Sequence, residues 1–402
     1  MKIRSMFYKI FNRKQVAYGN WLDDLHNNKS LFVPYTNAPF VRKNDTPKLF
    51  AYYLTQFHAI PENDYAHGLG FTEWTNVASC APQFPGHFQP KIPYDVGFYN
   101  LLDIDVMRRQ VEIAKAYGIY GFCFYYYWFS GKKVLEKPLY NFLKSDIDFH
   151  FHLCWANENW SRLWDGGNKE VILEQKHQED DAKKFFYDIL PFIKDKRYER
   201  IDNKPILMIY NPKLFDADAC KKFLEDLNAL AKENGFDGFW FMTSNAFDFE
   251  NPIEYGFRGV IEFPPHTFWS KAKRLKIRKV SQLVNFDVLS MTGIIDKKLW
   301  NNNEPYLVFR GVFPSWDNSP RKAYSNGFCF NISGQEFEKW LSDVLVWTRK
   351  HNPKNQQYVY INAWNEWAEG AILEPTTRYG YAALESVKKV LEKNDKEFCD
   401  EK

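Results

Sequence analysis

Eight short apolar runs recur along the chain, and a polar segment follows most of them. Runs of this length, rich in β-branched and aromatic residues, are typical of strands that are buried on both faces. We therefore predict eight buried strands, at Leu49–Thr55, Ile119–Tyr126, Phe149–Trp155, Pro205–Tyr210, Gly238–Thr243, Gly259–Phe263, Tyr306–Val312 and Tyr358–Ala363.

Apolar residues with helical spacing stand between several of these runs. Met107, Val111 and Ala114 share one helical face, and Ser333 with Glu336 forms a capping box. Strands and helices that alternate over eight units predict an α/β fold, a (β/α)8 TIM-type barrel with long βα loops, with an open doubly wound sheet as the alternative. Prolines interrupt the first part of the chain, so we predict an N-terminal appendage over residues 1–48 and a barrel domain over residues 49–402.

The last apolar run ends in two closely spaced carboxylates. Glu366 and Glu369 flank Trp367 and precede Gly370, which places them on a turn. Like charges at this spacing, beside a tryptophan, raise the pKa of one carboxyl above its ordinary value. One protonated and one ionised carboxyl is what cleavage of a glycosidic bond requires, so we predict that Glu366 and Glu369 are catalytic. Two solvated loop glutamates are the alternative.

Polar residues beside Trp or Tyr recur where the predicted strands end. In a barrel of this kind the active site lies at the C-terminal ends of the strands. Aromatic rings next to amides and carboxylates are typical of a sugar-binding cleft. We predict substrate binding by Tyr53, Gln56, His58, Glu73, Trp74, Tyr126, Trp128, Trp155, Asn157, Glu158, Trp160, Tyr210, Trp316, Asp317, Asn365 and Trp367.

Other motifs compete for a metal or an anion. The triplets Asp103–Asp105, Asp146–Asp148 and Asp216–Asp218 invite a metal and a nucleotide sugar, but two of them precede predicted helices, where aspartate caps backbone amides. We interpret His150 and His152 as core or hydrogen-bonded histidines and expect no metal and no cofactor. The basic segment Lys271–Lys279 fits a diphosphate, an acidic glycan or a membrane surface, although a solvated helix face is the interpretation we favour.

The composition of the chain indicates which partners and which cellular compartment to expect. A formal charge of +3 over 402 residues is too small to indicate nucleic acid as a partner, and 18% aromatic residues suit sugar binding. No apolar stretch is long enough to span a membrane, and six cysteines without a CxxC pair indicate buried free thiols in a reducing compartment. We predict a cytoplasmic protein. Its basic N-terminal segment is either a packed leader or an amphipathic helix that associates peripherally with the inner membrane.

Six motifs occur in order between Leu49 and Leu384: LTQFHAIPEND, GFTEWTNV, YGIYGFCFYYYWF, LCWANENW, KPILMIYNP and INAWNEWAEG. Together they resemble the WbsX-type family, glycosyltransferases of bacterial surface-polysaccharide assembly. That family is similar to glycoside hydrolase family 99, the endo-α-mannosidase-like barrels.

The resemblance implies a role for each glutamate. Glu366 would deprotonate the substrate's 2-hydroxyl, giving a 1,2-anhydro sugar and retained configuration, and Glu369 would protonate the leaving oxygen. Ala368 stands where the hydrolases often have His, so the same substrate contacts are not implied. Asn157–Glu158 resembles the Asn-Glu pair of other barrel glycosidases, which makes Glu158 a rival for one catalytic role.

We therefore predict a carbohydrate-active enzyme that forms or remodels glycosidic bonds of a surface polysaccharide, of lipopolysaccharide, O-antigen or capsule type. A retaining endo-α-glycosidase or transglycosylase is one alternative, and a non-catalytic glycan-binding barrel is another. The expected partner is an oligosaccharide or polysaccharide. A transferase would in addition need a nucleotide sugar or a lipid-linked sugar.

Overall fold

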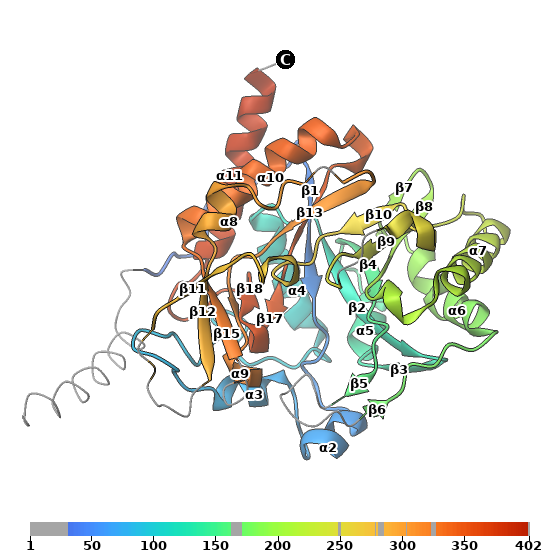
Figure 1. Ribbon diagram of the computed structural model, residues 1–402, viewed down its shortest axis with the longest axis horizontal. Coiled ribbons are helices and arrows are strands. Elements are labelled where there is room, and N and C mark those ends of the chain that lie inside the picture. Colours follow the sequence, from blue (N-terminus) through green and yellow to red (C-terminus); the bar gives the residue numbers. More distant parts are fainter. Residues whose placement is uncertain are drawn as a thin grey trace, which may run out of the picture.

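Eight parallel strands form a closed ring in the computed structural model, which describes residues 31–161, 171–247, 251–277, 279, 285–302, 304–322 and 327–400. The last strand, β16, pairs with β1, and β1 pairs in turn with β2, so the sheet closes on itself. Most of the strands are labelled in Figure 1. Each predicted apolar run overlaps one of these strands, so the barrel is confirmed and the open sheet is wrong. In ring order the strands are β1 (Lys48–Tyr53), β2 (Gly121–Phe129), β4 (His150–Trp155), β8 (Lys204–Ile209), β9 (Trp240–Ser244), β10 (Gly259–Ile261), β13 (Leu307–Val312) and β16 (Tyr358–Ile361).

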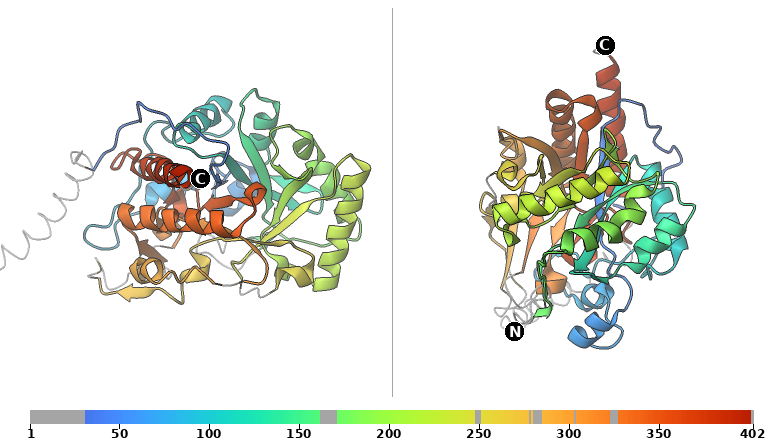
Figure 2. Two further views of the ribbon diagram at one scale, coloured as in Figure 1. Left: turned by 90° about the horizontal axis from the view of Figure 1, so that it is seen from above. Right: turned by 90° about the vertical axis from the view of Figure 1, so that its right-hand side faces the viewer.

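Helices surround the ring, as the view from above shows (Figure 2). The longer ones are α4 (Ile104–Ala116), α5 (Lys137–Lys144), α6 (Asp181–Lys194), α7 (Ala217–Glu233), α10 (Gly334–His351) and α11 (Ala382–Asp400). The capping box predicted ahead of α10 is present, because the Ser333 hydroxyl accepts from the Glu336 amide and the Glu336 carboxylate accepts from the Ser333 amide. Asp103 and Asp216 accept from amides at the starts of α4 and α7, which confirms the capping interpretation.

Many short elements lie in the loops that follow the strands, mainly in the lower part of Figure 1. Those at that end are α2 (Pro61–His67), α3 (Glu73–Ser79), β3 (Lys132–Val134), β5 (Trp160–Ser161), β6 (Val171–Leu173), α9 (Ser319–Lys322), β17 (Asn365–Glu366), η6 (Trp367–Glu369) and β18 (Ala371–Ile372). The others are β7 (Arg200–Ile201), η2 (Pro212–Leu214), η3 (Pro252–Tyr255), η4 (His266–Phe268), α8 (Thr292–Asp296) and η5 (Lys354–Gln356).

A separate four-stranded sheet packs beside the barrel in the order β11 (Lys273–Leu275), β12 (Phe286–Ser290), β15 (Gly327–Asn331) and β14 (Trp316–Asp317). Its first strand lies within the basic segment Lys271–Lys279, and β11 pairs antiparallel with β12. The solvated helix face expected for this segment is therefore wrong, because the chain there is extended. Arg278 lies outside the described residues.

The barrel interior is filled with aromatic side chains. Phe50, Tyr52 and Tyr360 are fully buried, and the rings of Phe50 and Tyr360 stack 5.8 Å apart. His152 Nε2 lies 2.9 Å from the Tyr360 hydroxyl, and His150 pairs with Glu199, which confirms both as hydrogen-bonded histidines. All six cysteines are free thiols, and five are buried, while Cys399 is exposed.

Residues 31–47 run along the barrel before β1 begins. The Phe40 amide donates to the Ala116 carbonyl at the end of α4, and the Tyr381 amide donates to the Val33 carbonyl. The division of the chain at residue 48 stays a prediction, and the basic N-terminal segment lies outside the described residues. Within the ranges that the structure describes, none of the helices is both long and apolar enough to cross a membrane.

Candidate active site

The two predicted catalytic glutamates lie on a tight turn that follows β16. Glu366 ends the short strand β17, and Glu369 ends the 3-10 helix η6. Gly370 then adopts a left-handed conformation with φ of 61°, which glycine tolerates and which lets the chain return as β18. The turn places both carboxyl groups at the C-terminal end of the barrel.

Neighbouring buried side chains hold this turn from behind. The Asn365 amide group accepts from the Leu54 amide at 2.8 Å and donates to the Leu54 carbonyl at 3.0 Å, which ties the turn to the end of β1. Trp367 Nε1 donates to the carboxylate of Glu374 at 2.6 Å. Asn365 and Trp367 are fully buried, so they position the turn and do not line the cavity.

A single arginine contacts three glutamates at this end of the barrel. Arg321 Nη1 lies 2.6 Å from Glu369 Oε1, and its Nη2 lies 2.9 Å from Glu73 Oε1 and 3.5 Å from Glu366 Oε2. Arg321 belongs to α9, which follows β13, while Glu73 belongs to α3, which follows β1. Because β13 and β1 both flank β16 in the ring, the three loops meet at this point.

Arg321 is a site residue that the sequence pattern did not predict. The signal available was its place in the loop after the seventh strand, four residues beyond Asp317. Nothing local to that loop indicates that the guanidinium meets carboxylates from two other loops.

Burial dominates the electrostatics of the pair. It raises the pKa of Glu366 well above its ordinary value, and the nearby charges of Glu369 and Glu73 act in the same direction, while Arg321 opposes them. Burial also raises the pKa of Glu369, although Arg321 counters this through its charge and its hydrogen bond. A carboxyl with a raised pKa retains its proton nearer to neutral pH, as an acid catalyst must.

A cavity opens beside the pair, with an empty volume of about 840 Å³ that includes solvent at its mouth. Of the predicted site residues, the cavity lining includes Gln56, Glu73, Glu158, Trp160, Tyr210, Glu366 and Glu369. The cavity is also lined by four residues that were not predicted from the sequence, namely Tyr125, Tyr127, Phe263 and His266.

The other predicted residues lie outside the lining, where all are buried except the half-buried Trp74, and strand geometry explains several of them. Successive side chains of a strand point to opposite faces. Tyr125 and Tyr127 of β2 face the cavity, whereas Tyr126 packs against rings of α6 and Trp128 donates to Asp188 of the same helix at 2.8 Å. The residues outside the lining are Tyr53, His58, Trp74, Tyr126, Trp128, Trp155, Asn157, Trp316, Asp317, Asn365 and Trp367.

Glu158, the rival for one catalytic role, lies on another wall of the cavity. Its Oε1 accepts from Asn211 Nδ2 at 3.0 Å, and burial raises its pKa above the ordinary value. Asn157 beside it exchanges hydrogen bonds with the Asn211 backbone, both at 2.8 Å. The arginine contacts therefore join Glu366 and Glu369 to Glu73, while Glu158 pairs with an amide.

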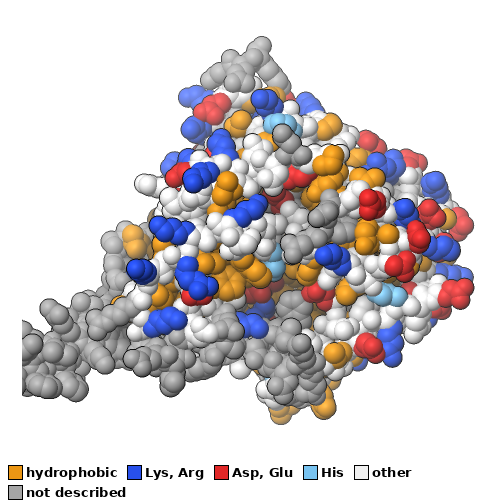
Figure 3. Space-filling model, viewed as in Figure 1, with side chains coloured by type: hydrophobic (Ala, Val, Ile, Leu, Met, Phe, Trp, Pro, Cys, Tyr) orange, Lys and Arg blue, Asp and Glu red, His pale blue; other side chains and the backbone are white. Residues whose placement is uncertain are grey.

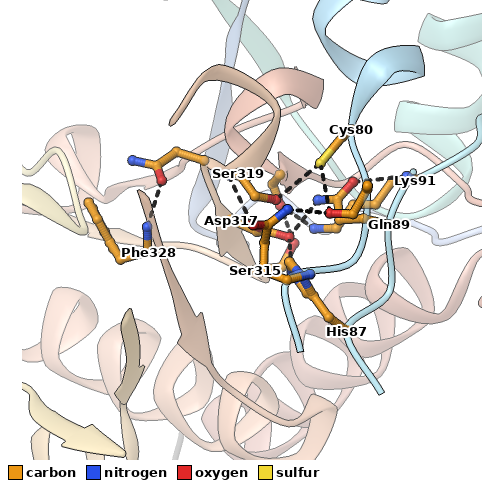
Figure 4. A network of polar contacts seen from close by, with 12 residues as sticks. Cys80, His87, Gln89, Lys91, Ser315, Asp317, Ser319 and Phe328 are labelled. Atoms are coloured by element: carbon orange, nitrogen blue, oxygen red, sulfur yellow. Dashed lines mark hydrogen bonds and ion pairs between the residues drawn. The ribbon is translucent and has the colours of Figure 1, made fainter. Parts of the chain in front are cut away.

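Asp317 is the centre of a buried polar network (Figure 4), and it lies next to Gly370 in the turn that carries Glu366 and Glu369. His87 Nε2 lies 2.8 Å from its carboxylate, and Gln89 also donates to it. Burial alone would raise the pKa of Asp317, but His87 and Lys91 outweigh it and hold the pKa well below its ordinary value.

Lys91 and Ser315 extend this network to the turn, because both donate to the Gly370 carbonyl, at 3.0 and 2.5 Å. The network therefore supports the residue that follows Glu369. Among the described residues, no three His, Cys, Asp or Glu side chains converge as a metal site.

Comparison with known proteins shows which sequences this chain resembles. A family model described as glycosyltransferase WbsX matches residues 49–387. The uncharacterized protein WxcX from two strains of Xanthomonas campestris pv. campestris is 37% identical over 344 residues, which are 85% of this chain and 49% of the relative. The chain thus spans about half the length of the curated relatives it matches.

Solved structures show the same fold at low identity. A family GH99 endo-alpha-mannosidase from Bacteroides thetaiotaomicron aligns with a TM-score of 0.54 and 12% identity, covering 90% of this chain and 100% of that one. A glycoside hydrolase-like protein aligns with a TM-score of 0.53 and 12% identity, covering 90% of this chain and 98% of that one.

Proposed function

The chain belongs to the WbsX glycosyltransferase family, and on this premise we propose that it is a carbohydrate-active enzyme that forms or remodels glycosidic bonds through Glu366 and Glu369. The observation that carries the proposal is a buried carboxyl and a partly buried one that share one guanidinium beside an aromatic-lined cavity. The biological setting we propose is the assembly of a bacterial surface polysaccharide.

The chemistry needs one protonated and one ionised carboxyl. The protonated carboxyl gives its proton to the glycosidic oxygen as the bond to the anomeric carbon breaks. The ionised carboxylate either removes the proton of the sugar 2-hydroxyl, whose oxygen then attacks the anomeric carbon, or attacks that carbon itself. Water or a sugar hydroxyl completes the reaction, which decides between hydrolysis and transfer.

The charges of the cavity favour a glycan over a nucleotide sugar. Among the described lining residues, Glu73, Glu158, Glu366 and Glu369 are acidic, and Arg321 is already shared among three of them. Burial lowers the pKa of His266 to about 4, so its ring is neutral near pH 7. A diphosphate would meet net negative charge here, and therefore a retaining α-glycosidase or transglycosylase is the second candidate function.

A ligand-binding measurement tests the proposal. We expect α-linked manno-oligosaccharides to raise the unfolding midpoint and nucleotide sugars to leave it unchanged. A ligand at 100 times its dissociation constant adds about 2.7 kcal/mol to the free energy of unfolding. Stabilisation by a nucleotide sugar alone would contradict the glycan-binding part of the proposal.

Turnover of the same oligosaccharides tests the catalytic pair. We expect Glu366→Gln and Glu369→Gln each to reduce product formation at least about 100-fold while binding persists, because general acid or base catalysis contributes about that much or more. Glu225→Gln on the exposed face of α7 is the matched control and should leave turnover unchanged. If both site variants keep wild-type turnover, the pair is not catalytic.

A further inference from the structure

Two buried carboxylates and one partly buried carboxylate surround one cation at the catalytic turn. The side chains of Glu73, Glu366, Arg321 and Glu369 are 2%, 8%, 9% and 19% exposed. If all three carboxyls were ionised, the cluster would carry a net charge of −2 in a buried site. Such a charge is costly without compensation, and a carboxyl relieves it by taking up a proton.

The contacts indicate which of the catalytic carboxyls takes that proton. Glu369 and Glu73 make charge-assisted bonds of 2.6 and 2.9 Å to the guanidinium, which favour their ionised forms. Glu366 lies at 3.5 Å, so its ionised form is stabilised least, and it stands next to both other negative charges.

The remaining groups that act on the pair do not reverse this order. Three tyrosines, Tyr125, Tyr127 and Tyr210, interact electrostatically with Glu366. Burial raises the pKa values of these phenols, so they stay neutral and add no charge. The positive charge of Lys322 favours the ionised form of Glu369, as the charge of Arg321 does.

We propose that Arg321, held in place by Glu73, is a positioning residue that assigns the proton of the pair to Glu366 and keeps Glu369 ionised. Glu366 is then the group that gives a proton to a leaving oxygen, and Glu369 is the base or nucleophile. This order is the reverse of the one that the resemblance to family 99 implies. Its catalytic meaning rests on the proposed function, whereas the proton distribution itself does not.

Neutron diffraction from crystals of the full chain, exchanged into D2O at pD 7, tests the distribution directly. We expect a deuteron on a carboxylate oxygen of Glu366 and none on Glu369. A deuteron on Glu369, or on neither residue, would overturn the inference. The measurement requires no turnover, so an inactive protein would sink the proposed function and leave this result standing.

The pH dependence of turnover tests the role of Arg321. Arg321→Gln should raise the pKa of Glu369, so the acidic limb of the kcat/KM profile moves about one to three units to higher pH. Arg321→Lys keeps the charge and should stay closer to the wild-type profile. Arg108→Gln, exposed on α4, should not move it. A loss of rate that is equal at every pH would assign Arg321 a structural role only.

Glu73→Gln is a second variant, for which the pH profile should shift in the opposite direction. Removing this negative charge should lower the pKa of Glu366, so the basic limb of the profile moves to lower pH. A shift to higher pH, or none, would contradict the assignment of the proton to Glu366.

Discussion

Glu374 is a buried carboxyl next to the turn that carries Glu366 and Glu369. It accepts hydrogen bonds from Tyr99 at 2.8 Å and from Gln110 and Trp367 at 2.6 Å each. Burial raises its pKa to about 7, even though these donors favour the ionised form. Glu374 therefore binds a proton more tightly in the folded protein than in the unfolded chain.

This shift predicts that folding stability depends on pH. Because the pKa of Glu374 is higher in the folded protein than in the unfolded chain, protonation of Glu374 stabilises the fold. This stabilisation is fully present below about pH 4.5 and is lost as the pH rises through about 7. The free energy of unfolding then changes by roughly 3 kcal/mol. Glu374→Gln removes the titration, so the gap in free energy of unfolding between wild type and variant should be larger at pH 5 than at pH 7.5. Urea unfolding at both values measures it, and a constant gap would contradict the prediction.

At the scale of single residues, the sequence predicts what local spacing determines. The proximity of Glu366 and Glu369 could be predicted, because a spacing of three residues on a turn brings two carboxyls together. Arg321 could not be predicted, because its role depends on contacts with Glu73, Glu366 and Glu369, which lie in other loops. The burial of Trp155 and Trp316 could not be predicted either, because a tryptophan beside a polar residue shows the same local sequence pattern in a core and in a cleft.

At the scale of elements, the phase of β2 decides which tyrosines face the cavity. The run Tyr125, Tyr126, Tyr127 and Trp128 is aromatic throughout, so no polar alternation reveals the phase. The structure places Tyr125 and Tyr127 at the cavity and turns Tyr126 toward Phe185 and Phe192 of α6.

Adjacent substitutions in β2 should therefore have different effects. Tyr126→Ala removes a ring that is 1% exposed and should lower the free energy of unfolding by about 3–5 kcal/mol. Tyr127→Ala removes a ring from the cavity wall and should weaken oligosaccharide binding more than Tyr126→Ala does. Calorimetric binding and urea unfolding of both variants measure the two effects, and equal losses of binding would argue against the observed phase.

The turn after Glu369 allows a second test at this scale. A Cβ on Gly370 would lie 2.7 Å from Lys91 Nζ and 2.9 Å from the Asp317 carbonyl oxygen. Gly370→Ala should displace the turn and reduce turnover by about 100-fold, since small misplacements of catalytic groups have effects of that size.

Gly235→Ala is the matched control for that substitution, because it has a positive φ of 91° and no atom within 4 Å of the added Cβ. It should cost stability of about 1 kcal/mol and leave turnover unchanged. Equal turnover in the two variants would show that the close contacts at Gly370 do not matter.

At the scale of the whole molecule, the ring of eight strands follows from the spacing of the apolar runs. The four-stranded sheet beside it does not, because β14 and β15 come from one βα loop and β11 and β12 from another. Pairing between loops depends on the finished barrel, which brings them together. The same reason explains why the basic segment was expected to be helical.

Residues 31–47 provide a prediction about the boundary of the folded unit. Arg42 donates to the Gly118 carbonyl at 2.7 Å, and Arg349 donates to the Asp45 carbonyl at 2.7 Å. A chain that begins at Leu49 should lose these contacts and unfold several degrees below one that begins at Leu31, measured by calorimetry. Equal midpoints would support a boundary at residue 48.

The basic strand β11 has a consequence for self-association. It lies at the edge of the four-stranded sheet, where backbone groups of an edge strand can pair with another chain. Lys271, Lys273, Arg274 and Lys276 are exposed there, and Figure 3 shows Lys and Arg side chains gathered over this region. Repulsion between such edges of two copies opposes strand pairing, so these charges protect the protein against aggregation whether or not they also bind a ligand.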